Sequence, residues 1–168
     1  MSQANDVVEN AFEAPKADLQ SGSGAQDILE FKRFSAWGVF FLSIITLGIY
    51  YLYWLYSRGI QMNEFAQEAK VKMNALYAYI VLSVLANILG IFDENTELAI
   101  ASGVLSLIGF VFYIIAVFSM RAALQEVINK SASEPVKLGG VLTFFFSAIY
   151  FQYKTNQAID LLQPADQA

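Results

Sequence analysis

The chain has 168 residues, of which 57% are hydrophobic, 15% aromatic and only 15% charged, and its formal net charge is −5. A composition this apolar suits lipid better than water. It contains no Cys and no His, which excludes disulfides, thiolate chemistry, the commonest metal ligand and the commonest general base. We therefore expect no catalytic residues, no cofactor and no metal site.

Residues 1–33 are expected to form a disordered, acidic N-terminal tail rich in Ala, Gln, Ser and Gly. No apolar stretch follows a basic start, so we expect no cleaved signal peptide and a cytoplasmic N-terminus. Phe12, Pro15 and Leu19 are apolar or rigid residues within this polar tail. They predict a short linear motif that binds a protein partner. The alternative is a tail that only keeps the protein soluble.

Residues 34–156 are predicted to form an all-α integral membrane domain, followed by a short polar C-terminal tail over 157–168. The domain contains four hydrophobic segments, at 36–56, 75–92, 98–120 and 138–153. A helix needs about 20 apolar residues to cross a bilayer. The first and third segments meet that length, the second is adequate and the fourth is short.

The positions of Lys and Arg distinguish two topologies. With four alternating spans and the N-terminus inside, six cations fall outside, against the positive-inside rule: Arg58, Lys70, Lys72, Arg121, Lys130 and Lys137. If only the second and third segments span, as a hairpin, and the first and fourth are re-entrant, every Lys and Arg is cytoplasmic. The loop 93–97, which has no positive charge, is then the outer loop. Both topologies remain open at this stage.

The first and fourth segments resemble each other at an offset of one hundred positions. Leu42, Ile49, Tyr50 and Tyr53 recur as Leu142, Ile149, Tyr150 and Tyr153. Such matches indicate an internal repeat, unless two aromatic-rich runs match by chance. Within the first copy, Thr46 and Gly48 predict a break between two short helices, because they offer a capping hydroxyl and a flexible glycine. A break in the fourth segment is less well supported.

The run LSIITLGIYYLYW at residues 42–54 is followed by a charged amphipathic stretch containing Asn63, and a weaker second element, IYFQYKTN, occupies 149–156. These motifs resemble those of a bacterial membrane family catalogued as domain of unknown function 4234, over roughly residues 34–162. The resemblance implies a multi-pass bacterial membrane protein and no known activity. The candidate repeat-motif residues are Thr46, Gly48, Tyr50, Tyr53, Trp54, Tyr150, Tyr153 and Asn156.

The second and third segments are predicted to pack as an antiparallel hairpin through small residues on facing stripes. The candidate packing residues are Ser83, Asn87, Gly90, Ser102 and Ser106. We expect Asn87 to bond Ser102 or Ser106 across the hairpin. The alternative is a functional role for Asn87, since polar groups inside membranes are often functional.

Helices are expected to continue beyond the apolar segments at 57–73 and 121–130. Glu68 with Lys72 and Glu126 with Lys130 have the i,i+4 spacing of helical ion pairs. We interpret both stretches as solvated helix ends rather than as helices lying on anionic lipid.

These patterns predict a non-enzymatic component of a bacterial inner membrane, which scaffolds or recruits a partner through its tail. The alternative function is an oligomeric permeation component for small molecules, ions or lipids. The expected partners are the lipid bilayer, a protein bound by the tail and a second copy of the chain. No basic footprint for nucleic acid is present.

Overall fold

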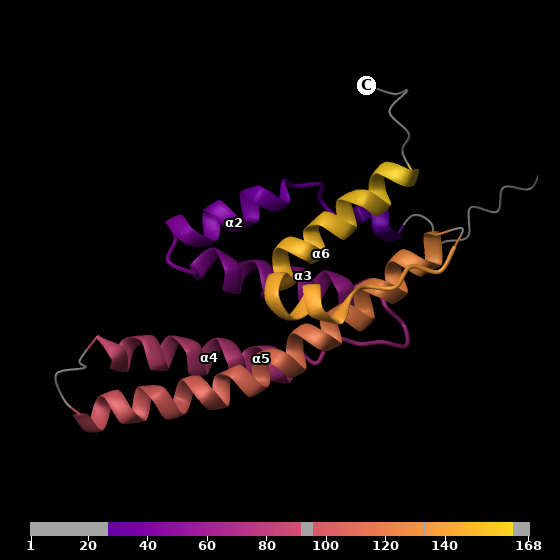
Figure 1. Ribbon diagram of the computed structural model, residues 1–168. Helices are drawn as coiled ribbons and strands as arrows, with labels where there is room; N and C mark the ends of the chain where they lie inside the picture. The colour runs from indigo at the N-terminus through magenta and orange to yellow at the C-terminus, as the bar shows by residue number, and fades with distance from the viewer. Residues whose placement is uncertain (1–26, 92–95, 133, 163–168) are drawn as a thin grey trace, which may run out of the picture.

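The computed structural model describes residues 27–91, 96–132 and 134–162. Their regular structure is entirely helical, as predicted (Figure 1). The elements are the 3-10 helix η1 (Ile28–Glu30) and the α-helices α2 (Ala36–Ile45), α3 (Ile49–Phe65), α4 (Met73–Gly90), α5 (Thr96–Ser131) and α6 (Gly140–Leu162). The predicted tail motif of Phe12, Pro15 and Leu19 lies outside the described residues, as do most of the loop 93–97 and the last residues of the C-terminal tail.

Helices α4 and α5 form a long antiparallel hairpin (Figure 1). Among the described residues they are the two helices that are long and apolar enough to cross a membrane. Of the four predicted hydrophobic segments, two therefore form helices of spanning length, and they are the second and third, which the hairpin topology assigned to the membrane. In the most apolar 18-residue stretch of each helix, only 11% of α4 and 17% of α5 are buried within the protein. The apolar surfaces of this hairpin thus point outward, unlike those of a core helix in a soluble protein.

The first hydrophobic segment is not one helix, because it breaks at Thr46–Gly48 as predicted. Leu47 and Gly48 adopt left-handed backbone conformations with φ of 51° and 89°. The Thr46 hydroxyl donates to the Leu42 carbonyl at 2.7 Å and accepts from the Tyr50 amide at 2.9 Å. Helices α2 and α3 consequently turn back on each other, and the segment enters and leaves at the same end of the molecule (Figure 1).

Helix α6 is also interrupted, at Ser147, where the backbone (φ 12°, ψ −92°) is not helical. The sequence supported this break less well than the first. Ser147 occupies the position that the offset of one hundred matches to Leu47, so both aromatic segments bend at the same place in their proposed repeat.

Helices α3 and α6 pack on the C-terminal half of α5, where the buried core lies, and α2 packs on α3 and α6 (Figure 1). Helix α5 continues to Ser131, well past its apolar part, as predicted for residues 121–130. Helix α3 instead ends at Phe65, so the predicted helix 57–73 is corrected to a shorter helix and a loop over 66–72. The hairpin tip and the α2–α3 turn both point away from this core (Figure 1).

Candidate functional site

A cluster of three hydroxyl groups joins α3, α5 and α6 at the α6 break. The Tyr51 and Tyr113 hydroxyls are 2.9 Å apart, and the buried Ser147 Oγ lies 2.5 Å from the first and 3.1 Å from the second. The Tyr79 ring packs on Tyr113 at 5.1 Å between centroids. Because the three hydroxyls satisfy one another, the cluster holds three helices together rather than offering an open polar path.

A second polar network lies one to two turns further along α3 and α6, and Gln152 is at its centre. The buried Gln152 Oε1 accepts from Trp54 Nε1 at 3.3 Å and from Arg58 at 3.4 Å. Its Nε2 donates to the Asn156 side chain at 2.9 Å. Trp54 and Gln152 come from the two proposed repeat copies, so their hydrogen bond connects the copies directly.

The network also fixes the backbone of residues 30–34, which runs beside α3 and α6. Asn156 Nδ2 donates to the Phe34 carbonyl at 2.7 Å, Arg58 donates to the Lys32 carbonyl at 2.8 Å, and Gln61 Nε2 donates to the Glu30 carbonyl at 2.9 Å. Three side chains thereby satisfy carbonyls that no helix uses, and they hold this segment at a defined distance from α3.

Between this segment and α3 lies an open groove of about 540 Å³. Its lining includes two cations, one carboxylate and several aromatic rings. The residues that line it are Lys32, Phe34, Tyr50, Tyr53, Trp54, Ser57, Arg58, Ile60, Gln61 and Glu64. The lining residues of α3 repeat at intervals of three and four, so they form one face of that helix. We call this feature the α3 groove.

Arg58 is the most constrained charge in the α3 groove. Its guanidinium donates to Gln61 Oε1 at 2.5 Å and to the Lys32 carbonyl and Gln152 as given above, and its Cζ lies 5.9 Å from the centroid of the Phe31 ring. The bonds recorded among the described residues use three of the five N–H groups of an Arg side chain. Lys32 and Glu64 have exposed side chains at the edges of the groove.

The structure separates the predicted repeat-motif residues into three places. Tyr50, Tyr53 and Trp54 line the α3 groove, and Asn156 supports it from α6. Thr46 and Gly48 form the α2–α3 turn instead. In the second copy, the Tyr150 hydroxyl accepts from the Gly139 amide at 2.9 Å, and Tyr153 is exposed next to the Lys154 amino group. Tyr150 thereby stabilises the start of α6, and neither tyrosine lines the groove.

Four of the five predicted packing residues of the hairpin, Asn87, Gly90, Ser102 and Ser106, line one shallow hollow, and Ser83 does not. The expected bond from Asn87 is wrong, however. Its Nδ2 donates at 2.7 Å to the Ser83 carbonyl in its own helix. The bond across the hairpin runs from Ser102 Oγ to the Ala86 carbonyl at 2.9 Å. A short hydroxyl reaches a facing carbonyl more directly than an amide can reach a facing hydroxyl.

A further polar site, absent from our sequence analysis, surrounds Glu126 on α5. Three successive backbone N–H groups of the 66–72 loop bind its carboxylate: Gln67 at 2.6 Å, Glu68 at 3.1 Å and Ala69 at 2.6 Å. Burial alone would raise the pKa of Glu126, but these bonds and the Lys130 charge outweigh it and hold the pKa below its ordinary value. The predicted Glu126–Lys130 pair is present at 3.9 Å. The Glu68–Lys72 helical pair is not, because these residues lie outside any helix.

Sequence reasoning overlooked Arg58, Gln61 and Gln152 as site residues. Gln152 could have been identified from the sequence, because a glutamine side chain within the aromatic run 149–156 needs a hydrogen-bond partner when it is buried. Arg58 and Gln61 had none, because charged and polar residues at a helix end are usually solvated. In the part of the chain that the structure describes, no group of three or more Asp, Glu, His or Cys residues is placed to hold a metal ion.

A family model, described as domain of unknown function (DUF4234), matches residues 34–161. The match covers both aromatic segments, the hairpin and every helix named here except η1. The chain therefore belongs to this family, as the motifs at 42–54 and 149–156 indicated. No curated protein and no solved structure matches the chain.

Proposed function

We propose that this DUF4234 protein is a non-enzymatic component of a bacterial inner membrane, in which α4 and α5 span the bilayer and the two aromatic segments insert partway from the cytoplasmic face. The core, the α3 groove and the 66–72 loop would form a rigid platform on that face. The platform and the tail that precedes it would recruit a partner to the membrane.

The separation of charge along the molecule is the observation that supports this proposal most strongly. No Lys or Arg occurs between residues 73 and 120, which is nearly the whole hairpin. Every described Lys and Arg belongs to the opposite end or to its boundary, which is marked by the bond from the Lys72 amide to Ser119 Oγ at 2.9 Å. Such a distribution is expected when that end faces the cytoplasm.

The position of the α2–α3 turn along the hairpin supports the partial insertion of the first aromatic segment into the bilayer. The Tyr51–Tyr113 bond and the bond from Lys130 to the Phe65 carbonyl show that α3 runs parallel to α5. Leu47, four residues before Tyr51, is therefore level with about Gly109, which packs against Leu82 near the middle of α4. The turn would reach about half the depth of the bilayer.

The surface of the turn suits lipid. Leu47, Ile45 and Ile49 are 94%, 75% and 71% exposed, which would be unfavourable in water. The backbone polar groups are nevertheless bonded within the turn: the amides of Leu47, Gly48 and Ile49 donate to the carbonyls of Ile44, Ser43 and Thr46. A turn with bonded amides and apolar side chains meets the requirement that hydrocarbon places on a chain that reverses inside it.

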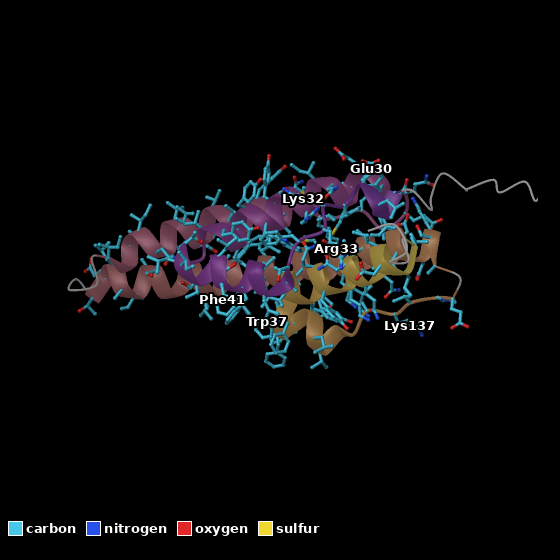
Figure 2. The ribbon with its side chains drawn as sticks, turned by 90° about the horizontal axis from the view of Figure 1, so that it is seen from above. Glu30, Lys32, Arg33, Trp37, Phe41 and Lys137 are labelled. Carbon is cyan, nitrogen blue, oxygen red and sulfur yellow. The ribbon has the colours of Figure 1, made fainter. Side chains whose placement is uncertain are left out.

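An aromatic and basic anchor precedes the turn. Lys32 and Arg33 are followed on α2 by Trp37 and Phe41, which are 66% and 57% exposed (Figure 2). Large rings beside cations are typical of the headgroup layer, where the rings contact acyl chains and the cations contact phosphate. This arrangement supports a position for α2 that starts at the membrane surface.

We also propose that the two aromatic segments arose by duplication. Their sequence matches and their backbone breaks at Leu47 and Ser147 share one offset of one hundred residues. Inserted repeats that flank a spanning hairpin are consistent with the pseudo-symmetry found in other membrane proteins.

Single-Cys labelling tests the topology cleanly, because the protein has no native Cys. An impermeant maleimide added to intact cells should label Glu97→Cys, and it should label Gln67→Cys and Glu134→Cys only after the membrane is opened. Labelling of positions 67 and 134 from outside would establish four alternating spans and refute the proposal.

Recruitment by the tail needs a separate experiment. Partners captured by the full-length protein should be lost with Phe12→Ala/Leu19→Ala and kept with Gln3→Ala/Gln20→Ala, a control pair that changes polar residues of the same tail. Identical partner lists from the two variants would show that the predicted motif recruits nothing.

A further inference from the structure

We infer that the α3 groove binds the phosphate of an anionic phospholipid headgroup, with Lys32 and Arg58 as its cationic contacts. This inference rests on the proposed membrane position of the protein and adds a ligand and a site to it. The evidence is the depth of the groove, the nature of its walls and the placement of its charges.

The α3 groove opens at the depth of lipid headgroups. Arg58 follows Tyr51 by seven residues on a helix parallel to α5, which places it level with about residue 120. This is the level of the Lys72–Ser119 bond, where the apolar hairpin ends and the first cations appear. A headgroup phosphate in the adjacent leaflet would reach the groove without leaving the membrane.

The walls of the groove suit a lipid better than a free ion. Tyr53 and Ile60, which line it, are 62% and 36% exposed, and Tyr50 and Tyr53 pack with ring centroids 6.1 Å apart. Tyr50 and Tyr53 lie between Arg58 and the inserted turn, so their rings would contact glycerol and acyl groups. Free phosphate would gain nothing from them.

The charges of the groove are arranged to bind an anion. The bonds of Arg58 to Gln61, Gln152 and the Lys32 carbonyl fix its guanidinium in the groove wall, and its other N–H groups can donate to a phosphate oxygen. The exposed amino group of Lys32 can swing toward the same point. Glu64 lies at the groove as well and opposes an anion, so removal of each charge has a predictable sign.

The test titrates the full-length protein in detergent with phosphatidylglycerol, phosphatidylcholine or inorganic phosphate, and native mass spectrometry counts the bound molecules. Phosphatidylglycerol should bind at least several-fold more tightly than phosphatidylcholine. Inorganic phosphate at millimolar concentration should not displace it. Displacement would identify the ligand as a free anion, and equal binding of both lipids would remove the role of charge; either result overturns the inference.

Three variants with matched charge changes assign the site. Lys32→Gln should weaken phosphatidylglycerol binding about fivefold, the loss of a partly exposed ion pair. Lys137→Gln removes the same charge from an exposed position at the opposite edge of the molecule (Figure 2) and should leave affinity unchanged. Glu64→Gln should leave it unchanged or increase it.

Other outcomes are equally informative. Equal losses for Lys32→Gln and Lys137→Gln would indicate general surface charge, and weaker binding by Glu64→Gln would indicate a ligand bound through an amine; each contradicts the inference. Arg58→Gln should abolish binding, and circular dichroism must show that it keeps its helices. Failure of phosphatidylglycerol to bind, with the labelling pattern intact, would refute the lipid site and leave the proposed topology standing.

Discussion

The carboxylate of Glu126 should be the main anchor of the loop between α3 and α4, and Glu126→Gln tests this. The three backbone N–H groups of residues 67–69 converge on its two oxygens at 2.6 to 3.2 Å. Loop 66–72 has no regular structure of its own, so these bonds satisfy N–H groups that would otherwise need water. The same loop connects the core to the hairpin.

The magnitude follows from the number of bonds that a Gln side chain can keep. The single carbonyl oxygen of a Gln side chain can accept from the loop N–H groups on one side only. The NH2 group of that side chain would face the remaining loop N–H groups and repel them. A hydrogen bond to a charged group contributes about 1.5 to 3 kcal/mol. The side chain of Glu126 is 19% exposed, so water screens part of this, and we expect a net loss of about 1 to 2 kcal/mol.

The effect must depend on pH with a definite sign. The pKa of Glu126 in the folded protein lies below its ordinary value of 4.5, against the opposing effect of burial, because the loop amides and Lys130 favour the carboxylate. The stabilisation is therefore fully present above the ordinary pKa and is lost as the pH falls through the lowered one. Glu126→Gln should remove this acid-dependent loss and give a flatter profile.

Tryptic cleavage after Lys70 or Lys72 in detergent measures how often the loop opens, and thermal unfolding between pH 3 and 7 measures stability. Glu126→Gln should be cleaved about five- to thirtyfold faster at neutral pH, the ratio that 1 to 2 kcal/mol gives when cleavage follows the open population. Glu134→Gln, which removes an exposed carboxylate from another loop, serves as the control. If both variants are cleaved at the wild-type rate, the hydrogen bonds between Glu126 and the loop amides do not hold the loop.

Three further substitutions test the fold itself. Gly48→Ala should destabilise the α2–α3 turn by about 1 to 2 kcal/mol, because φ is 89° there even though nothing lies within 4 Å of the added methyl; unchanged thermal stability would contradict this. Tyr51→Phe removes the hydroxyl 2.5 Å from Ser147 and should cost about 1 to 2 kcal/mol, whereas equal stability would show that the cluster adds nothing. Gly90→Leu should separate the two helices of the hairpin, because the added Cβ would lie 3.6 Å from Ser102 Oγ and the rest of the leucine side chain needs further space. If an engineered disulfide between positions 86 and 102 still forms in this variant, the prediction is refuted.

The sequence was sufficient for features that depend on local chemistry and on total apolar length. The α4–α5 hairpin, its small facing residues and the extension of α5 follow from hydropathy and side-chain size. The number of helices long enough to cross a membrane did not follow, because the breaks within the first and fourth segments leave no trace in their apolar composition. What shortens them is backbone geometry at one or two positions, to which a count of apolar residues is insensitive.

The loop after α3 shows why the helix 57–73 was overpredicted. The residues from Glu64 to Lys72 have good helix propensity and a favourable i,i+4 pair, so local rules continue the helix. In the structure the Asn63 side chain bonds both the amide and the carbonyl of Val71, at 2.6 and 3.2 Å, and Glu126 binds the amides between them. These tertiary bonds favour the loop over the helix, and nothing in the segment itself specifies the partner on α5.

The two breaks in the aromatic segments differ in what stabilises them, and this explains why only the first was predicted with good support. The turn at Thr46–Gly48 is stabilised by its own residues, because the threonine hydroxyl caps α3 and the glycine adopts a positive φ without strain. At Ser147 there is neither glycine nor proline, and the stabilising groups are Tyr51 and Tyr113, 96 and 34 residues away in the sequence. The second break therefore depends on the first segment being in place. If α3 were displaced, Ser147 would lose the Tyr51 hydroxyl and keep only that of Tyr113 on α5, and helical hydrogen bonding through residue 147 would become more favourable for α6.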